Sequence, residues 1–276
     1  MTDISIALKW GPGLIGMTIG LAFYGVSVWQ YLFYIMSFPR DRRLVKCAVF
    51  LVFVLDTVNT LTSLSFYCRT LILCRWKTTN SCMLQLPWDL SANLGSGFFV
   101  SFFVQCFYAH RVWIIGGQSK LLMGIVLFVA LAALVLGFLI LGDMYNNNDL
   151  GALFNNPYSP VNALASAICD GIITISIYLS LRRSQSGLLR KQNSLQKLNI
   201  VFVQMGTITS LSALSMAILY YQNQPVGEYL TSAPGFMISK AYSNSMLAVL
   251  NARKLVNDQQ QLTLSPSELP TLPRIR

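Results

Sequence analysis

Residues 121–142 read LLMGIVLFVALAALVLGFLILG, an apolar stretch without a single charged side chain. A helix rises about 1.5 Å per residue, so about 20 such residues cross the roughly 30 Å hydrocarbon core of a bilayer. The stretch lacks the alternation of apolar and polar residues that a membrane-spanning β-strand would show. It therefore predicts a transmembrane helix and indicates the class of the whole chain.

Six further stretches are long and apolar enough to be compared with it. Three carry no charge, two hold one aspartate each, and the last contains Pro234, Gly235 and Lys240. Together the stretches predict an all-α, polytopic membrane bundle of seven transmembrane helices, at about 13–36, 47–67, 90–108, 121–142, 161–181, 198–221 and 229–250. We expect one transmembrane domain over residues 1–254 and a disordered cytoplasmic tail over residues 255–276, which is rich in Gln, Ser, Thr and Pro.

The composition of the chain supports a lipid environment. Of its 276 residues, 54% are hydrophobic and only 11% are charged. An ordinary soluble domain carries about 25% charged residues, so this chain could not cover a water-facing surface of its size. Binding to nucleic acid would need a basic face with interleaved aromatic residues on a soluble module, and the sequence offers none. The lipid bilayer is the expected partner.

The basic residues predict the orientation of the bundle, because they prefer the cytoplasmic side of a membrane when they lie in short loops. With seven spans and the N-terminus outside, fifteen of the twenty lysines and arginines fall in inner segments. We therefore expect the N-terminus outside and the C-terminus in the cytoplasm. The inner basic loops, above all the cluster from Arg182 to Lys197, can contact anionic lipid or a cytoplasmic partner protein.

The cysteines and the single histidine bear on redox state and metals. The loop 68–89, predicted to lie outside, contains Cys68, Cys74 and Cys82. Cys74 and Cys82 are a candidate disulfide in an oxidising compartment, and free thiols are the open alternative. His110 cannot build a zinc site alone. We expect no metal site and no cofactor.

Several short motifs occur in a fixed order along the chain. They are YG at 24–25, QY at 30–31, FPRDR at 38–42, LDT at 55–57, QCFYAHR at 105–111, KAYSNS at 240–245 and LNAR at 250–253. Together they resemble a large family of membrane proteins from mushroom-forming fungi, catalogued as domain of unknown function 6534. The resemblance runs from about Gly13 to Arg253. It implies seven helices and an integral membrane location, but no activity and no catalytic residues.

Three ionisable residues lie near the midpoints of predicted spans. They are Asp56, Asp170 and Lys240. Ionisable side chains are costly in a bilayer and usually face the bundle interior or one another. Equal depth suggests that Asp56 and Lys240 form a buried pair with Asp170 across a cavity. Such a pair is either structural or the floor of a ligand site.

Other polar residues extend this candidate intramembrane cluster. Asn59 shares a helix face with Asp56, and Asn244 shares one with Lys240, by i+3 and i+4 spacing. Gln105, on the third span, adds interior hydrogen-bonding capacity. Gly16 and Gly20 form a GxxxG pattern, which suits close helix packing within the bundle or in a dimer.

Three functions are compatible with these residues. We favour a receptor-like sensor of a small lipophilic ligand, which rests mainly on the number and orientation of the spans. One alternative is a membrane-embedded enzyme of the acid-initiated cyclase type, with Asp56 or Asp170 as proton donor. The other is a proton-coupled transporter that uses the same residues as a relay. Common catalytic motifs such as GxSxG and HExxH are absent, which favours a non-enzymatic role.

Overall fold

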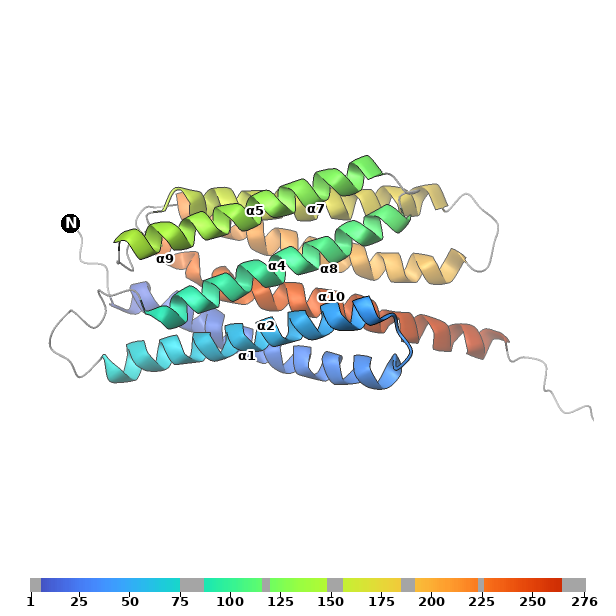
Figure 1. Ribbon diagram of the computed structural model, residues 1–276, viewed down its shortest axis with the longest axis horizontal. Helices are drawn as coiled ribbons and strands as arrows, with labels where there is room; N and C mark the ends of the chain where they lie inside the picture. The colour runs from blue at the N-terminus through green and yellow to red at the C-terminus, as the bar shows by residue number, and fades with distance from the viewer. Residues whose placement is uncertain are drawn as a thin grey trace, which may run out of the picture.

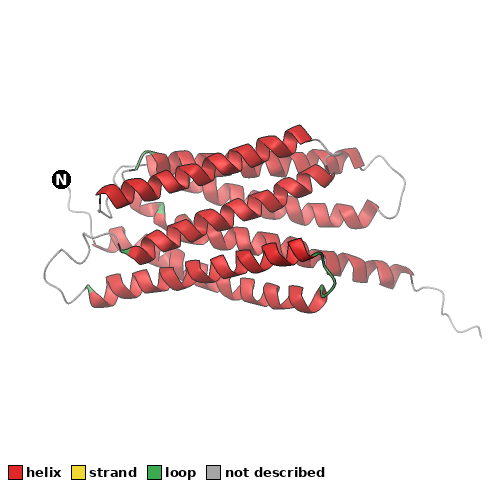
Figure 2. Cartoon of the chain, viewed as in Figure 1, coloured by secondary structure: helices red, strands yellow, loops and turns green. Residues whose placement is uncertain are grey.

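The computed structural model describes residues 6–74, 87–115, 120–147, 156–184, 192–222 and 226–264, and these residues are helical almost throughout (Figures 1 and 2). The long helices are α1 (Ile6–Ser37), α2 (Arg43–Cys68), α4 (Trp88–Ile115), α5 (Lys120–Asn147), α7 (Tyr158–Ser184), α8 (Gln192–Tyr221) and α10 (Ser232–Leu264). A π-helical turn, η1 (Arg69–Leu73), continues α2, and the short α9 (Val226–Leu230) precedes α10. The described part contains no strand, so the predicted all-α fold is confirmed.

The long helices lie side by side in a ring that follows the order of the sequence (Figure 1). Each helix packs on the one before it and the one after it, and α10 closes the ring between α8 and α1. The last helix also contacts α2 and α4 and therefore reaches into the middle of the bundle. Short connections between neighbours favour this antiparallel arrangement.

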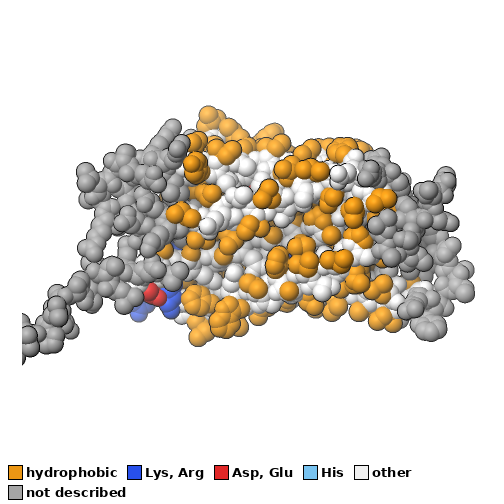
Figure 3. Space-filling model, turned by 180° about the vertical axis from the view of Figure 1, so that it is seen from behind, with side chains coloured by type: hydrophobic (Ala, Val, Ile, Leu, Met, Phe, Trp, Pro, Cys, Tyr) orange, Lys and Arg blue, Asp and Glu red, His pale blue; other side chains and the backbone are white. Residues whose placement is uncertain are grey.

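Six helices are long and apolar enough to cross a membrane: α1, α2 with η1, α4, α5, α7 and α8. The outer surface shows the same apolar character (Figure 3), with large side chains such as Trp29, Met36 and Phe128 exposed by 69%, 82% and 72%. A soluble bundle would bury such residues, whereas a bilayer solvates them. This surface is that of an integral membrane protein.

Helix α10 does not reach the apolarity of the other six. Its polar residues Ser239, Lys240, Ser243 and Ser245 are buried inside the bundle, where they contact other helices and not lipid. A helix enclosed in this way needs no continuous apolar surface. The seventh span therefore stays a prediction that rests on the position of α10 in the ring.

The last helix differs from its predicted bounds at both ends. The predicted span 229–250 is interrupted at Thr231, where α9 ends and α10 begins. Pro234 therefore lies in the first turn of α10, where its missing N–H is tolerated. At the other end, α10 continues to Leu264, into the region predicted as a disordered tail, because Arg253–Lys254 and the following glutamines are good helix formers. Residues 265–276 lie outside the described residues.

The GxxxG pattern of α1 packs within the chain. A Cβ atom on Gly16 would overlap the backbone of Ala233, coming within 2.7 Å of its Cα. A Cβ atom on Gly20 would lie 3.2 Å from the carbonyl oxygen of Phe236. The two glycines thus let α1 approach the first turns of α10.

Candidate functional site

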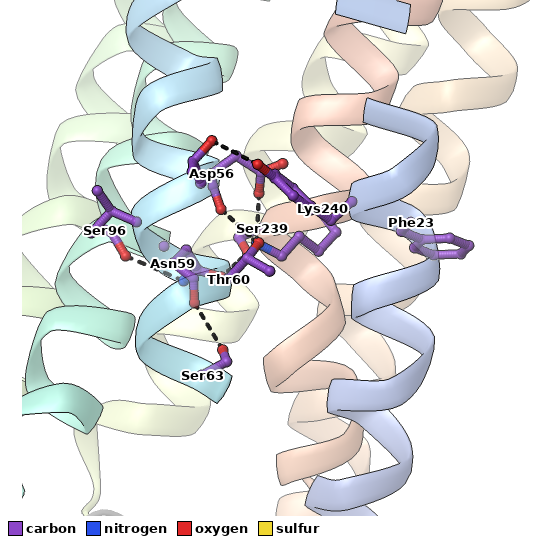
Figure 4. Close-up of polar contacts among 12 residues, drawn as sticks. Phe23, Asp56, Asn59, Thr60, Ser63, Ser96, Ser239 and Lys240 are labelled. Atoms are coloured by element: carbon purple, nitrogen blue, oxygen red, sulfur yellow. Dashed lines mark hydrogen bonds and ion pairs between the residues drawn. The ribbon is translucent and has the colours of Figure 1, made fainter. Parts of the chain in front are cut away.

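Asp56 of α2 and Lys240 of α10 meet in the middle of the bundle, as their equal depth predicts (Figure 4). The distance from Lys240 Nζ to Asp56 Oδ1 is 2.8 Å, and the two side chains are 3% and 0% exposed. The ammonium also donates to Thr60 Oγ1 at 2.6 Å and to the Asp56 carbonyl oxygen at 2.9 Å. Three acceptors therefore satisfy the three N–H bonds of Lys240.

Asn59 lies one turn further along α2 and joins three helices. Its side-chain amide donates to the carbonyl oxygen of Asn93 on α4 at 2.7 Å, while its amide oxygen accepts from Ser239 on α10 at 3.0 Å. Asn93 returns a bond of 2.7 Å to the carbonyl oxygen of Asn59. Gly97 makes room for this contact, because a Cβ atom there would lie 3.4 Å from Asn59 Nδ2.

Asp170 does not face the Asp56–Lys240 pair but forms a second cluster. It accepts from the hydroxyl of Tyr242 at 2.8 Å and from the amide of Gln105 at 3.3 Å. Gln105 also donates to the Tyr242 hydroxyl at 3.3 Å. Tyr242 follows Lys240 by two residues, about 200° around the helix, so the two aspartates bind opposite sides of α10.

Asn244 belongs to neither cluster. Its side-chain amide donates to the carbonyl oxygen of Phe23 on α1 at 2.9 Å, and Asn251 makes the equivalent bond to Gln30 at 2.8 Å. The face that Lys240 shares with Asn244 therefore binds α10 to α1. Asn244 was predicted to belong to the interior cluster, but this part of the face joins α10 to α1 and does not line the cavity.

A cavity of about 100 Å³ lies between α4, α5, α7, α8 and α10, and Asn59 of α2 lines it from one side. Asn59, Asn93, Gln105 and Ser239 form part of its wall, and Phe98, Leu134, Ile140, Met216 and Ile238 supply apolar surface. Neither Asp56, Asp170 nor Lys240 is among its lining residues. Of the six predicted cluster residues, Asn59 and Gln105 line the cavity.

The α7 wall of the cavity carries a polar group without a partner. Asn162 Nδ2 is buried and makes no hydrogen bond to any described residue. Its amide oxygen is 3.5 Å from the hydroxyl of Ser166, which also lines the cavity. A buried, unsatisfied N–H group costs about 1–3 kcal/mol, so a bound acceptor would be stabilising here.

Three residues of these clusters and of the cavity wall were not among the predicted site residues: Asn162, Ser239 and Tyr242. The pattern Ser159, Asn162, Ser166, Asp170 repeats at helical spacing and indicates a polar inner face on α7. Ser239 directly precedes the KAYSNS motif and Tyr242 lies within it, but nothing in the sequence tells which neighbouring helix each one contacts.

At the end of the bundle where α1 ends and α2 begins, two of the sequence motifs meet. Asp41, from the FPRDR motif, accepts from Arg253 Nη2 at 2.7 Å and from the Tyr34 hydroxyl at 3.0 Å. The Arg253 guanidinium also lies 4.4 Å from the centre of the Phe38 ring. Burial opposes ionisation of Asp41, but the hydrogen bond and charge of Arg253 outweigh it and lower the pKa of this carboxyl.

The predicted disulfide falls partly outside the described residues. Cys74, which follows η1, is buried and disulfide-bonded. Cys82 lies outside the described residues, so its pairing with Cys74 stays a prediction. Cys47, Cys68, Cys106 and Cys169 are free thiols. Among the described residues no group of histidines, cysteines or acids could hold a metal ion.

The chain matches a known protein family over part of its length. Residues 166–255 match a family of unknown function, DUF6534. The comparisons with curated proteins and with solved structures find no match to the chain. The matched segment runs from α7 to α10 and includes Asp170, Lys240 and Tyr242. Over these residues the chain resembles the family of unknown function DUF6534.

Proposed function

We propose that this protein is a receptor-like sensor that binds a small amphipathic molecule in the cavity between α4, α5, α7, α8 and α10. The observation that carries the proposal is the wall of that cavity, which combines apolar side chains with a small number of amides and hydroxyls. Ligand sites in proteins have this character, since apolar walls supply affinity and a few polar groups orient the ligand. The free N–H of the Asn162 amide can donate to a ligand that has a carbonyl, ether or hydroxyl oxygen.

The size of the cavity limits the ligand. At about 100 Å³ it is smaller than the 300–1,000 Å³ sites that hold drug-sized molecules. It is closer to an engineered cavity of about 150 Å³ that binds benzene. The expected ligand is therefore a compact molecule with one polar end, no larger than benzene, comparable to a short-chain alcohol or ketone.

Two hydrogen-bond networks connect residues of the cavity wall to the neighbouring helices. Asn59 touches the cavity and binds Ser239, the neighbour of Lys240. Gln105 touches the cavity and binds Asp170 and Tyr242. A ligand that changes either contact alters how α10 is held by α2, α4 and α7. At one end α10 projects beyond the other helices (Figure 1). These contacts support a sensor, because they couple occupancy of the cavity to one helix.

The same geometry gives less support to the alternative of a membrane-embedded enzyme of the acid-initiated cyclase type. None of the described residues that line the cavity carries a carboxyl or amino group. Asp56 is paired with Lys240, and Asp170 is hydrogen-bonded to Tyr242 and Gln105. A proton donor for a cyclisation would need to reach the substrate.

The test is ligand-dependent thermal stability of the purified protein against a panel of small lipophilic alcohols and ketones. At a concentration of 100 Kd a ligand adds about 2.7 kcal/mol, which corresponds to a shift of roughly 5–10 °C for a chain of this size. We expect Asn162→Leu to lose the shift and Asn147→Leu, the same change at an exposed position, to keep it. A panel without a hit, or a hit unaffected by Asn162→Leu, would contradict the proposal. A hit recovered chemically unchanged separates a sensor from an enzyme.

A further inference from the structure

A second hollow lies at the Asp41 end of the bundle, on the outside, between α1 and α2. It measures about 360 Å³ and is lined by Tyr31, Tyr34, Ile35, Phe38, Pro39, Lys46, Val49 and Phe50. Tyr34 and Val49 are buried and form its floor, while Ile35 and Phe50 are exposed at its rim. The ring of Tyr31 is stacked on that of Phe53 at 4.0 Å, which fixes one wall. An apolar groove of this size thus opens toward the bilayer.

The end of the groove is strongly basic. Lys46 lines it and donates to the carbonyl oxygen of Pro39, which leaves two further N–H bonds on its ammonium. Arg40, Arg42 and Arg43 are exposed next to it. The one acid of this loop, Asp41, already binds Arg253 at 2.7 Å.

We infer that the groove is a binding site for an anionic phospholipid, with one acyl chain against Ile35, Phe50 and the aromatic wall and the phosphate at Lys46 and Arg43. A soluble anion or a neutral lipid would match only one of the two parts of the groove, its basic end or its apolar wall. A soluble anion would use the basic end but leave the apolar groove empty, whereas a neutral lipid would fill the groove and leave the excess positive charge uncompensated. Basic clusters where a helix leaves the membrane attract anionic headgroups for this reason.

The inference is independent of the interior cavity, since no residue lines both sites. It is tested by native mass spectrometry of the protein released from mixed micelles that contain phosphatidylglycerol or phosphatidylcholine. We expect the wild type to retain one phosphatidylglycerol more tightly than phosphatidylcholine. Lys46→Gln should weaken retention of phosphatidylglycerol about five-fold, which is the effect of one basic side chain near an anionic surface. Lys120→Gln, at an exposed position on the same end of the bundle, should have no effect.

Two further variants cover the remaining outcomes. Phe50→Ala removes the rim of the groove and should weaken retention of both lipids alike. Arg43→Gln replaces the Lys46 variant if that one does not fold, because Arg43 is exposed. Equal losses in Lys46→Gln and Lys120→Gln would overturn the inference and indicate diffuse attraction between charges. Displacement of the bound lipid by soluble glycerol phosphate would also overturn it, because the site would then recognise the phosphate alone.

Discussion

Removal of the Asp56 carboxylate should strongly destabilise the bundle, because it leaves the Lys240 ammonium charged and buried. In the wild type Lys240 Nζ is 2.8 Å from Asp56 Oδ1 and only 3% of its side chain is exposed. Asp56→Ala leaves the Thr60 hydroxyl and a backbone carbonyl as acceptors, but no counter-charge. Breaking a buried pair by removing one partner costs about 3–5 kcal/mol.

The matched control is the double variant Asp56→Leu with Lys240→Met. It removes both charges and replaces them with apolar side chains of similar volume, an exchange that is often neutral or stabilising. We therefore expect the double variant to regain most of the stability that Asp56→Ala loses. The assay is equilibrium unfolding in detergent micelles, followed by tryptophan fluorescence. An Asp56→Ala variant within about 1 kcal/mol of the wild type would refute the reasoning, as would a double variant no more stable than the single one.

Three further results are expected. Asp41→Asn should lower the free energy of unfolding by about 1 kcal/mol at pH 7, as the loss of a well-placed surface ion pair does. Because the folded-state pKa of Asp41 is lowered, this loss should persist down to the unfolded carboxyl pKa near 4 and shrink as the pH falls through the folded-state pKa. Equilibrium unfolding of both proteins from pH 7 to pH 3 measures it. Gly16→Ala should cost about 1–3 kcal/mol by pushing α1 away from Ala233, whereas Gly25→Ala, with open space around it, should be neutral or slightly stabilising in the same unfolding assay. If Cys82 is the partner of Cys74, alkylation of the unfolded, unreduced chain followed by peptide mapping should leave both of these cysteines unlabelled. Labelling of Cys82 in the wild type would contradict this pairing.

The all-α class and the order of the helices could be predicted because a bilayer demands long apolar helices, and these are visible in the sequence. Residues 121–142 alone predict α5 to within a few residues of its observed bounds. The last helix was less predictable, because α10 is held by polar contacts inside the protein and carries no apolar stretch of the usual strength. Its break at Thr231 does have a local signal, because Pro234 is tolerated in the first turn of a helix and not in its interior.

The contact between Asp56 and Lys240 could be predicted from depth, since two buried charges of opposite sign at one level stabilise each other. The position of Asp170 could not. Depth says nothing about direction around a helix, and the two-residue separation of Lys240 and Tyr242 turns the second cluster to the other side of α10. The cavity was also unpredictable, because its wall comes from six helices and its unpartnered amide, Asn162, is defined only by the absence of a neighbour.

The central claim, that a small ligand occupies the interior cavity, is tested most directly by protection of a cysteine placed there. Ser166→Cys puts a thiol on the cavity wall, and Ile168→Cys puts one on the exposed side of the same helix. Each variant is labelled with a small thiol reagent, with and without a compound that raises thermal stability, and peptide mapping locates the label. The account predicts that the compound slows labelling at position 166 at least several-fold and leaves position 168 unchanged. Equal labelling rates at position 166 with and without the compound would contradict it.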